Sequence, residues 1–243
     1  MFDVDLLESN LEYKKKFNEI IYCPTTQSTN NEVWSFYQKV PKKYLIITDN
    51  QTAGMGRGLN RWFSTTNKSL TCSFILNQIF PVEKFNFHSL VIPISIIRGV
   101  KKYLSLDLKI KWPNDIIYND FKVGGILIET KKYSGKYVFN VGIGINVNEL
   151  LDDFPVEIRD TTTSLKIITN TEYSREQILV SIMDKIESNY YFELDNIFNK
   201  WVELCGHINQ PTKIYLWDKT ITGNFMGINN LGHARLKINN TEK

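Results

Sequence analysis

The stretch Lys109-Ile-Lys-Trp-Pro-Asn-Asp-Ile-Ile117 is the part of the sequence that says most about the fold. It predicts two short extended pieces, 109–112 and 115–118. A helix is predicted within 85–106, before these pieces, and an apolar hairpin is predicted over 123–147, after them. Helices and strands mix here without a regular β-α-β alternation. The sequence therefore favours an α+β fold over a doubly wound sheet.

The centre of this stretch carries polar groups in a restrained backbone. Pro113 restricts Trp112 to an extended conformation, which would fix the direction of the Lys111 side chain. A lysine ammonium there could offset charge that develops at a phosphoanhydride in a transition state. A solvated lysine beside a packed tryptophan is the commoner situation for a single lysine. Asn114 and Asp115 add groups that could orient a ligand or bind a metal.

The remaining elements divide the chain into a large and a small part. Further helices are predicted over 29–40 and 173–204, and strands over 44–48, 69–76, 123–132 and 136–147, the last two joined through Ser134-Gly135. The tail predicts three short strands, 213–217, 220–228 and 233–238, with turns at Asp218-Lys219 and 229–232. We therefore expect a larger domain, 1–205, and a small β domain, 206–243.

Composition narrows the class of protein. The chain has 243 residues, 42% of them hydrophobic, which is enough for a packed globular domain. The net charge of +3 is well below that of a dedicated nucleic-acid binder. The longest apolar stretch, 90–97, is too short to span a bilayer, and the acidic first ten residues do not form a signal peptide. Three widely spaced cysteines (Cys23, Cys72 and Cys205) indicate a reducing compartment, so we expect a cytoplasmic protein.

A glycine-rich segment, Gln51 to Trp62, follows the predicted strand 44–48. Glycines at 54, 56 and 58 let the backbone approach a ligand, and successive N–H groups could form an anion-binding concavity. Arg57 offers a fork for phosphate or carboxylate, and Trp62 could stack on a ligand. A flexible surface loop is an equally good interpretation of the glycines alone. The pattern is neither a P-loop nor a dinucleotide fingerprint.

Two other regions could contact a ligand: the glycine pairs of two predicted strands and a polar run at the start of a predicted helix. The strands 122–129 and 141–147 carry glycine pairs, where a flat ligand or another backbone could come close, although relief of strand packing is the commoner use. The Ser28-Thr29-Asn30 run starts the helix 29–40, for which Ser28 or Thr29 could be the N-cap, with Glu32 at capping-box distance from Thr29. Its hydroxyls could cap the helix, bind a small polar group, or do both.

Together these stretches resemble the biotin–protein ligases. The matching elements are, in chain order, Ser28-Thr-Asn30, Gly54-x-Gly-Arg-Gly58 ending in Trp62, Lys111-Trp-Pro-Asn-Asp115, Lys122-x-Gly-Gly-Ile-Leu127 and Gly142-x-Gly-Ile-Asn-Val147. The resemblance runs from about 25 to 165, and Lys111–Asp115 is its most specific element. It implies a catalytic domain related to the class II aminoacyl-tRNA synthetases, followed by a small SH3-like β domain.

The resemblance also implies roles for individual residues. Catalytic roles fall on Lys111, Arg57 and Asp115. Biotin contacts fall on Ser28, Thr29, Asn30, Gln51, Gly54, Met55, Gly56, Arg57, Lys111 and Gly125. ATP contacts fall on Arg57, Trp62, Asn114, Lys122 and Asn146, and the segment 152–164 would cover the adenylate. Many members have arginine in place of Met55, so a side-chain contact there would be lost while a backbone contact would persist.

The implied reaction uses ATP, with Mg²⁺ held by its phosphates, to activate biotin as an acyl adenylate. Biotin then passes to one lysine of a biotin carboxyl carrier domain of a carboxylase. Only about two dozen residues precede the Ser-Thr-Asn match, so we expect no winged-helix domain and no nucleic-acid partner. We also expect no membrane partner. Both a monomer and a homodimer stay open.

Two alternatives remain at this stage. A lipoate or octanoate ligase would use the related fold with a different substrate, although the Lys-Trp-Pro-Asn-Asp element disfavours it. A non-enzymatic binding module with an SH3-like tail belongs to another class. The modest charge and the number of phosphate-type features argue against that module.

Overall fold

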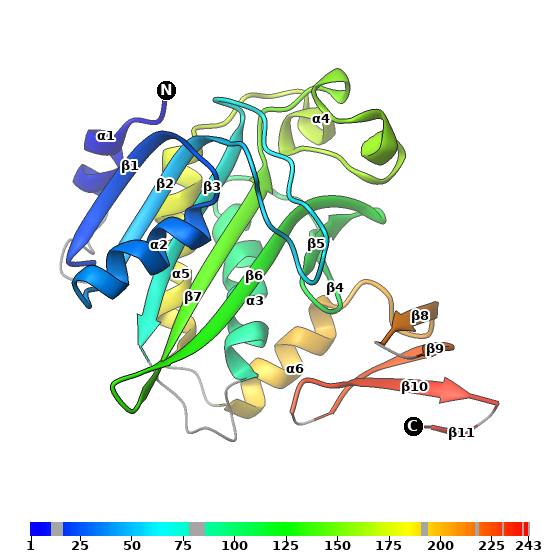
Figure 1. Ribbon diagram of the computed structural model, residues 1–243. Helices are drawn as coiled ribbons and strands as arrows, with labels where there is room; N and C mark the ends of the chain where they lie inside the picture. Colours follow the sequence, from blue (N-terminus) through cyan, green and yellow to red (C-terminus); the bar gives the residue numbers. More distant parts are fainter. Residues whose placement is uncertain are drawn as a thin grey trace.

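A seven-stranded sheet, in the order β1-β2-β3-β7-β6-β5-β4, organises the computed structural model (Figure 1). The structure describes residues 1–10, 17–77, 86–190, 194–216, 219–229, 231–239 and 241–242. The strands are β1 (Glu19–Thr26), β2 (Tyr44–Gln51), β3 (Ser69–Asn77), β4 (Lys109–Lys111), β5 (Asp115–Tyr118), β6 (Phe121–Tyr133) and β7 (Lys136–Asn146). Among neighbouring strands of this sheet, as far as the structure describes it, β1 and β2 pair in parallel, because helix α2 (Thr29–Lys39) crosses between them, and the other neighbours pair antiparallel. The mixed sheet confirms the predicted α+β class.

Helices cover both faces of this sheet. On one face, Val33 and Trp34 of α2 pack against Tyr44 and Ile46 of β2. Leu45 of β2 faces the main core on the other side, with α3 (Phe87–Lys101) and α5 (Arg175–Tyr190). Burial on both faces explains the uninterrupted apolar run of β2, which would alternate with polar residues in a half-exposed strand.

The predicted hairpin is confirmed. β6 and β7 pair in antiparallel register up to Tyr133 and Lys136. Ser134 and Gly135 between them have φ of 47° and 81°. Positive φ at both central residues is the geometry of a type I′ turn, whose twist matches that of the two strands.

The helix predicted over 173–204 is two helices, α5 and α6 (Leu194–Leu204). Both pack on α3, and α6 also contacts β4. One straight helix over this range would be about 48 Å long, roughly twice the length of α3, and would extend past the core that it has to cover. The predicted start of α3 at Phe85 lies outside the described residues.

The tail forms a second sheet, in the order β11-β10-β9-β8. Its strands are β8 (Pro211–Tyr215), β9 (Thr220–Ile228), β10 (Ala234–Ile238) and β11 (Thr241–Glu242). A small C-terminal β unit is therefore confirmed, although Trp217, Asp218 and Asn230 of the predicted strand and turns lie outside the described residues. The domain boundary at 205/206 stays a prediction. At this point the two parts are joined by a backbone hydrogen bond, in which Gly206 donates its N–H to the carbonyl of Ile110 in β4, at 2.9 Å.

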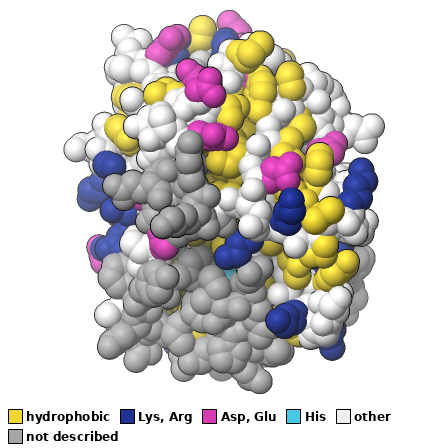
Figure 2. All heavy atoms as spheres, turned by 90° about the vertical axis from the view of Figure 1, so that its left-hand side faces the viewer, with side chains coloured by type: hydrophobic (Ala, Val, Ile, Leu, Met, Phe, Trp, Pro, Cys, Tyr) yellow, Lys and Arg dark blue, Asp and Glu magenta, His cyan; other side chains and the backbone are white. Residues whose placement is uncertain are grey.

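Shorter elements complete the chain. They are α1 (Val4–Asn10), the 3₁₀ turns at Leu151–Asp153 and Val156–Thr161, and α4 (Leu165–Thr169). None of the described helices is long and apolar enough to cross a membrane. On the face that carries α1 and β1, acidic and basic side chains are interspersed among hydrophobic ones (Figure 2).

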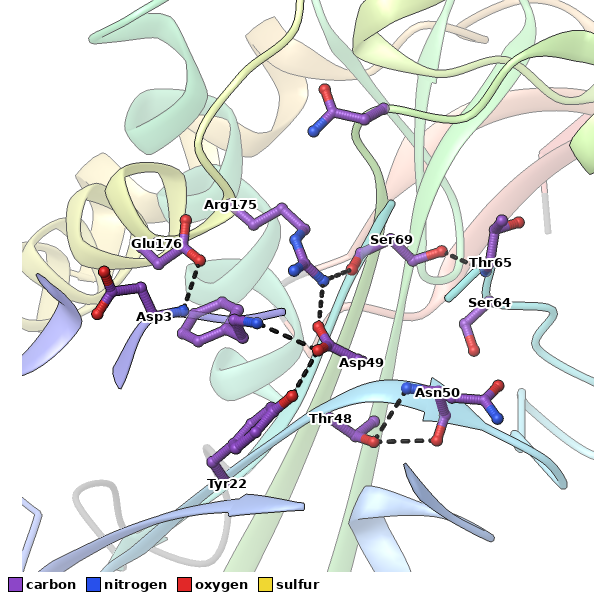
Figure 3. A network of polar contacts seen from close by, with 12 residues as sticks. Asp3, Tyr22, Thr48, Asp49, Asn50, Ser64, Thr65, Ser69, Arg175 and Glu176 are labelled. Atoms are coloured by element: carbon purple, nitrogen blue, oxygen red, sulfur yellow. Dashed lines mark hydrogen bonds and ion pairs between the residues drawn. The ribbon is translucent and has the colours of Figure 1, made fainter. Parts of the chain in front are cut away.

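A buried ion pair ties α5 and the N-terminal segment to the sheet (Figure 3). Arg175 Nη1 lies 2.7 Å from Asp49 Oδ1, and the two side chains are only 6% and 5% exposed. The other Asp49 oxygen accepts hydrogen bonds from the Tyr22 hydroxyl and from the N–H of Phe2. These bonds and the guanidinium hold the pKa of Asp49 below its ordinary value, despite burial.

Replacing Arg175 with methionine removes one partner of a buried pair and leaves Asp49 uncompensated. We expect Arg175→Met to lower the free energy of unfolding by about 3–5 kcal/mol. Urea unfolding at pH 7 measures this change. Lys42→Met is the control, because Lys42 and its partner Glu19 are both about half exposed; it should unfold almost as the wild type does. Equal, small effects of both substitutions would show that the buried Arg175–Asp49 pair does not stabilise the fold more than an exposed pair does.

Candidate active site

One cavity of about 1270 Å³ lies between the central sheet, the glycine-rich segment and the C-terminal sheet. It collects most of the residues predicted for the site. Its lining includes Ser28, Thr29, Asn30, Gln51, Met55, Gly56, Arg57, Trp62, Lys111, Asn114, Asp115, Lys122 and Gly125. Gly54 and Asn146 do not line it. Residues far apart in the sequence thus share one hollow.

A chain of buried and partly buried hydrogen bonds fixes the N-terminus of α2 at this cavity. Gln51 Oε1 accepts from the N–H of Thr29 at 2.8 Å and from its hydroxyl at 3.1 Å. The Thr29 hydroxyl lies 2.6 Å from that of Ser73, which donates to Asn30 Oδ1, also at 2.6 Å. Asn30 Nδ2 then donates to Glu129 at 2.8 Å. Asn30 is thereby engaged inside the protein at both ends of its carboxamide.

The predicted capping box is wrong. Ser28 is the N-cap residue of α2, but its hydroxyl makes no capping bond, and Gln51 accepts the Thr29 N–H instead. Glu32 accepts a hydrogen bond from Thr26 rather than from the N-cap backbone. A partner from β2 has replaced the local cap, which leaves the buried Ser28 hydroxyl at the cavity wall.

The glycine-rich segment is a small hairpin, not an open concavity. Met55 pairs with Arg61, the Gly56 N–H donates to the Asn60 carbonyl at 2.9 Å, and the Trp62 N–H donates to that of Gly54 at 3.0 Å. These amides are therefore not available to an anion. Among the three glycines only Gly58, at the tip, has positive φ, 69°. A Cβ on Gly54 would collide with the Trp62 carbonyl, which explains that glycine.

The glycines of β7 make room for side chains of this protein. A Cβ on Gly142 would overlap Asn30 Oδ1, and a Cβ on Gly144 would overlap the Trp62 ring. The close approach predicted for a flat ligand is thus made by the indole of Trp62. Its Nε1 is buried and has no hydrogen-bond partner among the described residues.

The turn between β4 and β5 connects three parts of the site. Lys111 borders the cavity as an exposed residue at the end of β4. Trp112, which precedes a cis bond to Pro113, donates to the carbonyl of Gly232 in the C-terminal sheet at 3.3 Å. Its ring centroid is 5.9 Å from the guanidinium carbon of Arg57, within cation–π range. Asn114 donates to the Ile126 carbonyl at 2.8 Å, which ties the turn to β6.

Asp115 and Lys122 form an ion pair of 2.7 Å across neighbouring strands. Gly125 lies opposite Asp115 in the sheet, and its missing side chain leaves space that the Lys122 side chain borders. Asn146 is buried behind this wall and donates to the Thr163 carbonyl at 2.9 Å. It therefore supports the wall and does not line the cavity, and its contact with ATP stays a prediction. Among the described residues, no group of three or more His, Cys, Asp and Glu side chains could hold a metal ion.

Sequence reasoning missed one wall of the cavity. This wall consists of Gln210 to Leu216 of the C-terminal part, together with His207. Ile158 lines its edge from the 152–164 segment. No local motif marks these residues, since their place follows from how the second sheet docks.

A buried acid anchors the 152–164 segment. Glu149 accepts a hydrogen bond from Ser69, and its carbonyl accepts one from Ser164, at 2.7 Å, whose side chain caps α4. Burial raises the pKa of Glu149 to about 7.

Comparison with known proteins gives this arrangement its family. The model of the biotin/lipoate A/B protein ligase family matches residues 22–148, more than half of the chain. The chain belongs to this family. Every predicted site residue lies within the matched range.

Individual relatives agree with that membership. The chain is 30% identical over 213 residues to the bifunctional ligase/repressor BirA of Bacillus spizizenii, covering 86% of this chain and 65% of that protein. It is 29% identical over 156 residues to the human biotin–protein ligase, covering 60% of this chain and 21% of that protein. The chain therefore spans less than two thirds of either relative.

A solved structure confirms the fold. The biotin protein ligase from Aquifex aeolicus, in complex with biotin and ATP, superposes with a TM-score of 0.79 at 27% identity. The match covers 93% of this chain and 95% of that one. The class II synthetase-like fold inferred from the resemblance is thus confirmed.

The buried acid at 149 makes stability depend on pH. The folded chain keeps Glu149 protonated up to about pH 7, whereas the unfolded chain ionises it near its ordinary pKa of 4.5. The stabilisation that protonated Glu149 gives the folded state is therefore fully present below pH 4.5 and is lost as the pH rises to about 7. We expect the free energy of unfolding of Glu149→Gln, relative to that of the wild type, to rise by about 3 kcal/mol between pH 4 and pH 8.

Urea unfolding of both proteins across this pH range measures the gain. Glu157→Gln, an exposed change in the same segment, should keep the wild-type profile. Parallel profiles for Glu149→Gln and the wild type would show that Glu149 ionises alike in both states.

Proposed function

We propose that the protein is a biotin–protein ligase: it activates biotin with ATP as biotinyl adenylate and transfers biotin to a lysine of a carboxylase's biotin carboxyl carrier domain. The observation that carries this proposal is one cavity lined by two chemically different sets of side chains. Neutral polar groups at the α2 N-terminus form one set, which we call the neutral end, and Arg57, Lys111 and Lys122 form the other, which we call the cationic end. Its volume of about 1270 Å³ suits two joined small molecules rather than one.

The neutral end suits the ureido ring of biotin. A urea has both donors and acceptors but no charge, so hydroxyls and carboxamides match it. Ser28 and Thr71 line the cavity, and the buried Thr71 hydroxyl has no partner among the described residues. Thr29, Asn30 and Gln51 would act mainly by holding this end in shape, since their side chains are bonded to one another or to Ser73 and Glu129.

The cationic end suits the phosphates of ATP. Lys111 would contact the biotin carboxylate and the α-phosphate, where negative charge gathers during attack. Arg57 would contact the same phosphate from the hairpin. Asp115 would orient Lys122 toward the nucleotide through their ion pair, with Trp62 and Asn114 nearby. Mg²⁺, when bound, would neutralise charge on the phosphates, which would themselves be its main ligands because Asp115 is already paired.

In the first half-reaction, a carboxylate oxygen of biotin attacks the α-phosphorus and pyrophosphate leaves. Met55, Gly56 and Arg57 of the hairpin would then cover the mixed anhydride, with the 152–164 segment closing the far edge. Excluding water matters because this anhydride hydrolyses readily. In the second half-reaction, a lysine amine of the carrier domain attacks the acyl carbon and AMP leaves.

The family also contains lipoate ligases, so the acid must be tested directly. Biotin is favoured because the relatives described above are named biotin–protein ligases or ligase/repressors. ATP–pyrophosphate exchange should depend on biotin and remain near background with lipoate or octanoate. Exchange that depends on lipoate would establish the alternative substrate. Absence of exchange with every acid would favour the non-enzymatic alternative.

Lys111 provides a sharper test of the mechanism. We expect Lys111→Ala to slow biotinyl adenylate formation by about 10²- to 10³-fold, because one preorganised cation near the α-phosphate is lost. Single-turnover quench with radiolabelled ATP measures adenylate directly. Lys109→Ala is the matched control, since Lys109 lies on the same strand but pairs with Asp107 outside the cavity lining. Adenylate formation at the wild-type rate in Lys111→Ala would refute the role.

A further inference from the structure

Glu129 is an acidic residue of β6 to which the proposed mechanism gives no role of its own. Its Oε2 accepts hydrogen bonds from Asn30 Nδ2 at 2.8 Å, from Trp34 Nε1 at 3.1 Å and from Asn140 Nδ2 at 3.5 Å. Glu129 does not line the candidate active-site cavity, whereas Asn30 does. Any influence of Glu129 on a ligand in that cavity therefore passes through Asn30.

Packing fixes where the Asn30 side chain lies, but not which way its carboxamide faces. Asn30 is 4% exposed, and a Cβ on Gly142 would overlap its Oδ1. Asn140 Nδ2 holds the Asn30 backbone by donating to its carbonyl at 2.9 Å. The oxygen and the NH₂ group of a carboxamide are close in size, so shape alone does not distinguish the two orientations. The hydrogen-bond partners make the choice.

Glu129 selects the orientation of that carboxamide. A carboxylate offers acceptors and no donor, so Asn30 turns Nδ2 toward it. Oδ1 then faces Ser73, whose hydroxyl donates to it at 2.6 Å. In the opposite orientation, the Asn30 oxygen would lie against the Glu129 oxygen and neither could donate.

This choice sets the direction of the next hydrogen bond, which reaches Thr29. The single hydroxyl proton of Ser73 goes to Asn30, so Thr29 is the donor in the 2.6 Å contact between the two hydroxyls. The Thr29 hydroxyl also lies 3.1 Å from Gln51 Oε1, but that distance is longer, and this oxygen already accepts the Thr29 N–H. With its proton committed to Ser73, Thr29 Oγ1 offers only lone pairs to any further group.

The direction matters for a ligand because Thr29 lines the cavity. A ligand group that meets Thr29 Oγ1 has to donate a hydrogen bond. The ureido ring of biotin carries N–H donors, whereas the dithiolane ring of lipoate carries none. The inference thus rests on the proposed function and concerns the choice of the acid.

We propose that Glu129 is a positioning residue for biotin. Acting through Asn30 and Ser73, its carboxylate makes Thr29 Oγ1 an acceptor for a ureido N–H and so favours biotin over an acid whose ring has no donor. Glu129 acts on the binding of biotin and not on the chemical step at the cationic end.

The test compares three variants of the full-length protein. Glu129→Met keeps the length of the side chain but removes the acceptor, whereas Glu129→Gln can turn its own Oε1 toward the same donors. Trp34→Phe is the matched control, because it removes the other short hydrogen bond to Glu129 Oε2 and leaves that of Asn30. ATP–pyrophosphate exchange gives the KM for biotin, the KM for ATP and kcat, and thermal melting gives the stability.

We expect Glu129→Met to raise the KM for biotin about tenfold or more, with the KM for ATP and kcat at saturating biotin within about twofold of wild type. Glu129→Gln should recover most of the biotin affinity. Trp34→Phe should lower the melting temperature but keep the KM for biotin within about twofold of wild type. If Glu129→Met does not fold, Glu129→Ala replaces it with the same expectation.

Other results would overturn the inference in distinguishable ways. An unchanged KM for biotin in Glu129→Met, equal rises in both KM values, or an equal rise in Trp34→Phe would show that Glu129 only stabilises the fold, while the ligase activity would stand. Failure of Glu129→Gln to recover biotin affinity would exclude the orienting role. Wild-type protein without any biotin-dependent exchange would refute the proposed function, and the Glu129 role would fail with it.

Discussion

The hydrogen-bonded chain that runs from Gln51 through Thr29 and Ser73 to Asn30 and Glu129 is the constraint on which the site depends. It joins β2, α2, β3 and β6 inside the protein, where an unpaired polar group would cost about 1–3 kcal/mol. Each member is satisfied only if the helix start and the three strands keep their relative positions. The chain therefore fixes the neutral end of the cavity before any ligand binds, and preorganisation of this kind lowers the cost of binding.

The cationic end is built differently, from one turn that reaches three neighbours. Trp112 contacts the C-terminal sheet and Arg57, while Asn114 is bonded to β6. Lys111, directly before them in the chain, owes its position to contacts made by these residues. The C-terminal sheet is thus a wall of the candidate active site as well as an appendage, and the backbone bond from Gly206 to Ile110 keeps that wall in register with β4.

For several residues, the sequence predicted the kind of contact correctly but not the residue or group that makes it. The glycines of β7 were correctly placed in a strand that something approaches closely, but the approaching groups are Asn30 and Trp62. The capping box at Thr29 failed because a glutamine 22 residues away in sequence competes for the same N–H. The glycine-rich segment, for which an anion-binding concavity and a flexible surface loop were equally good interpretations, closes on itself as a hairpin. In each case a non-local partner, or pairing within the loop, replaced the contact that a local pattern implied.

What the sequence determined by itself is the set of elements and the motif residues, because hydrophobic periodicity and turn chemistry act over a few neighbours along the chain. The β6–β7 hairpin, the buried run of β2 and the Lys111–Asp115 turn all follow from such short-range rules. Only the tertiary structure decided that Gln210 to Leu216 and Arg57 line one cavity, and that Arg175 neutralises Asp49. Those relations depend on how separate elements dock, and docking is set by shape and burial summed over the whole core, which no local window contains.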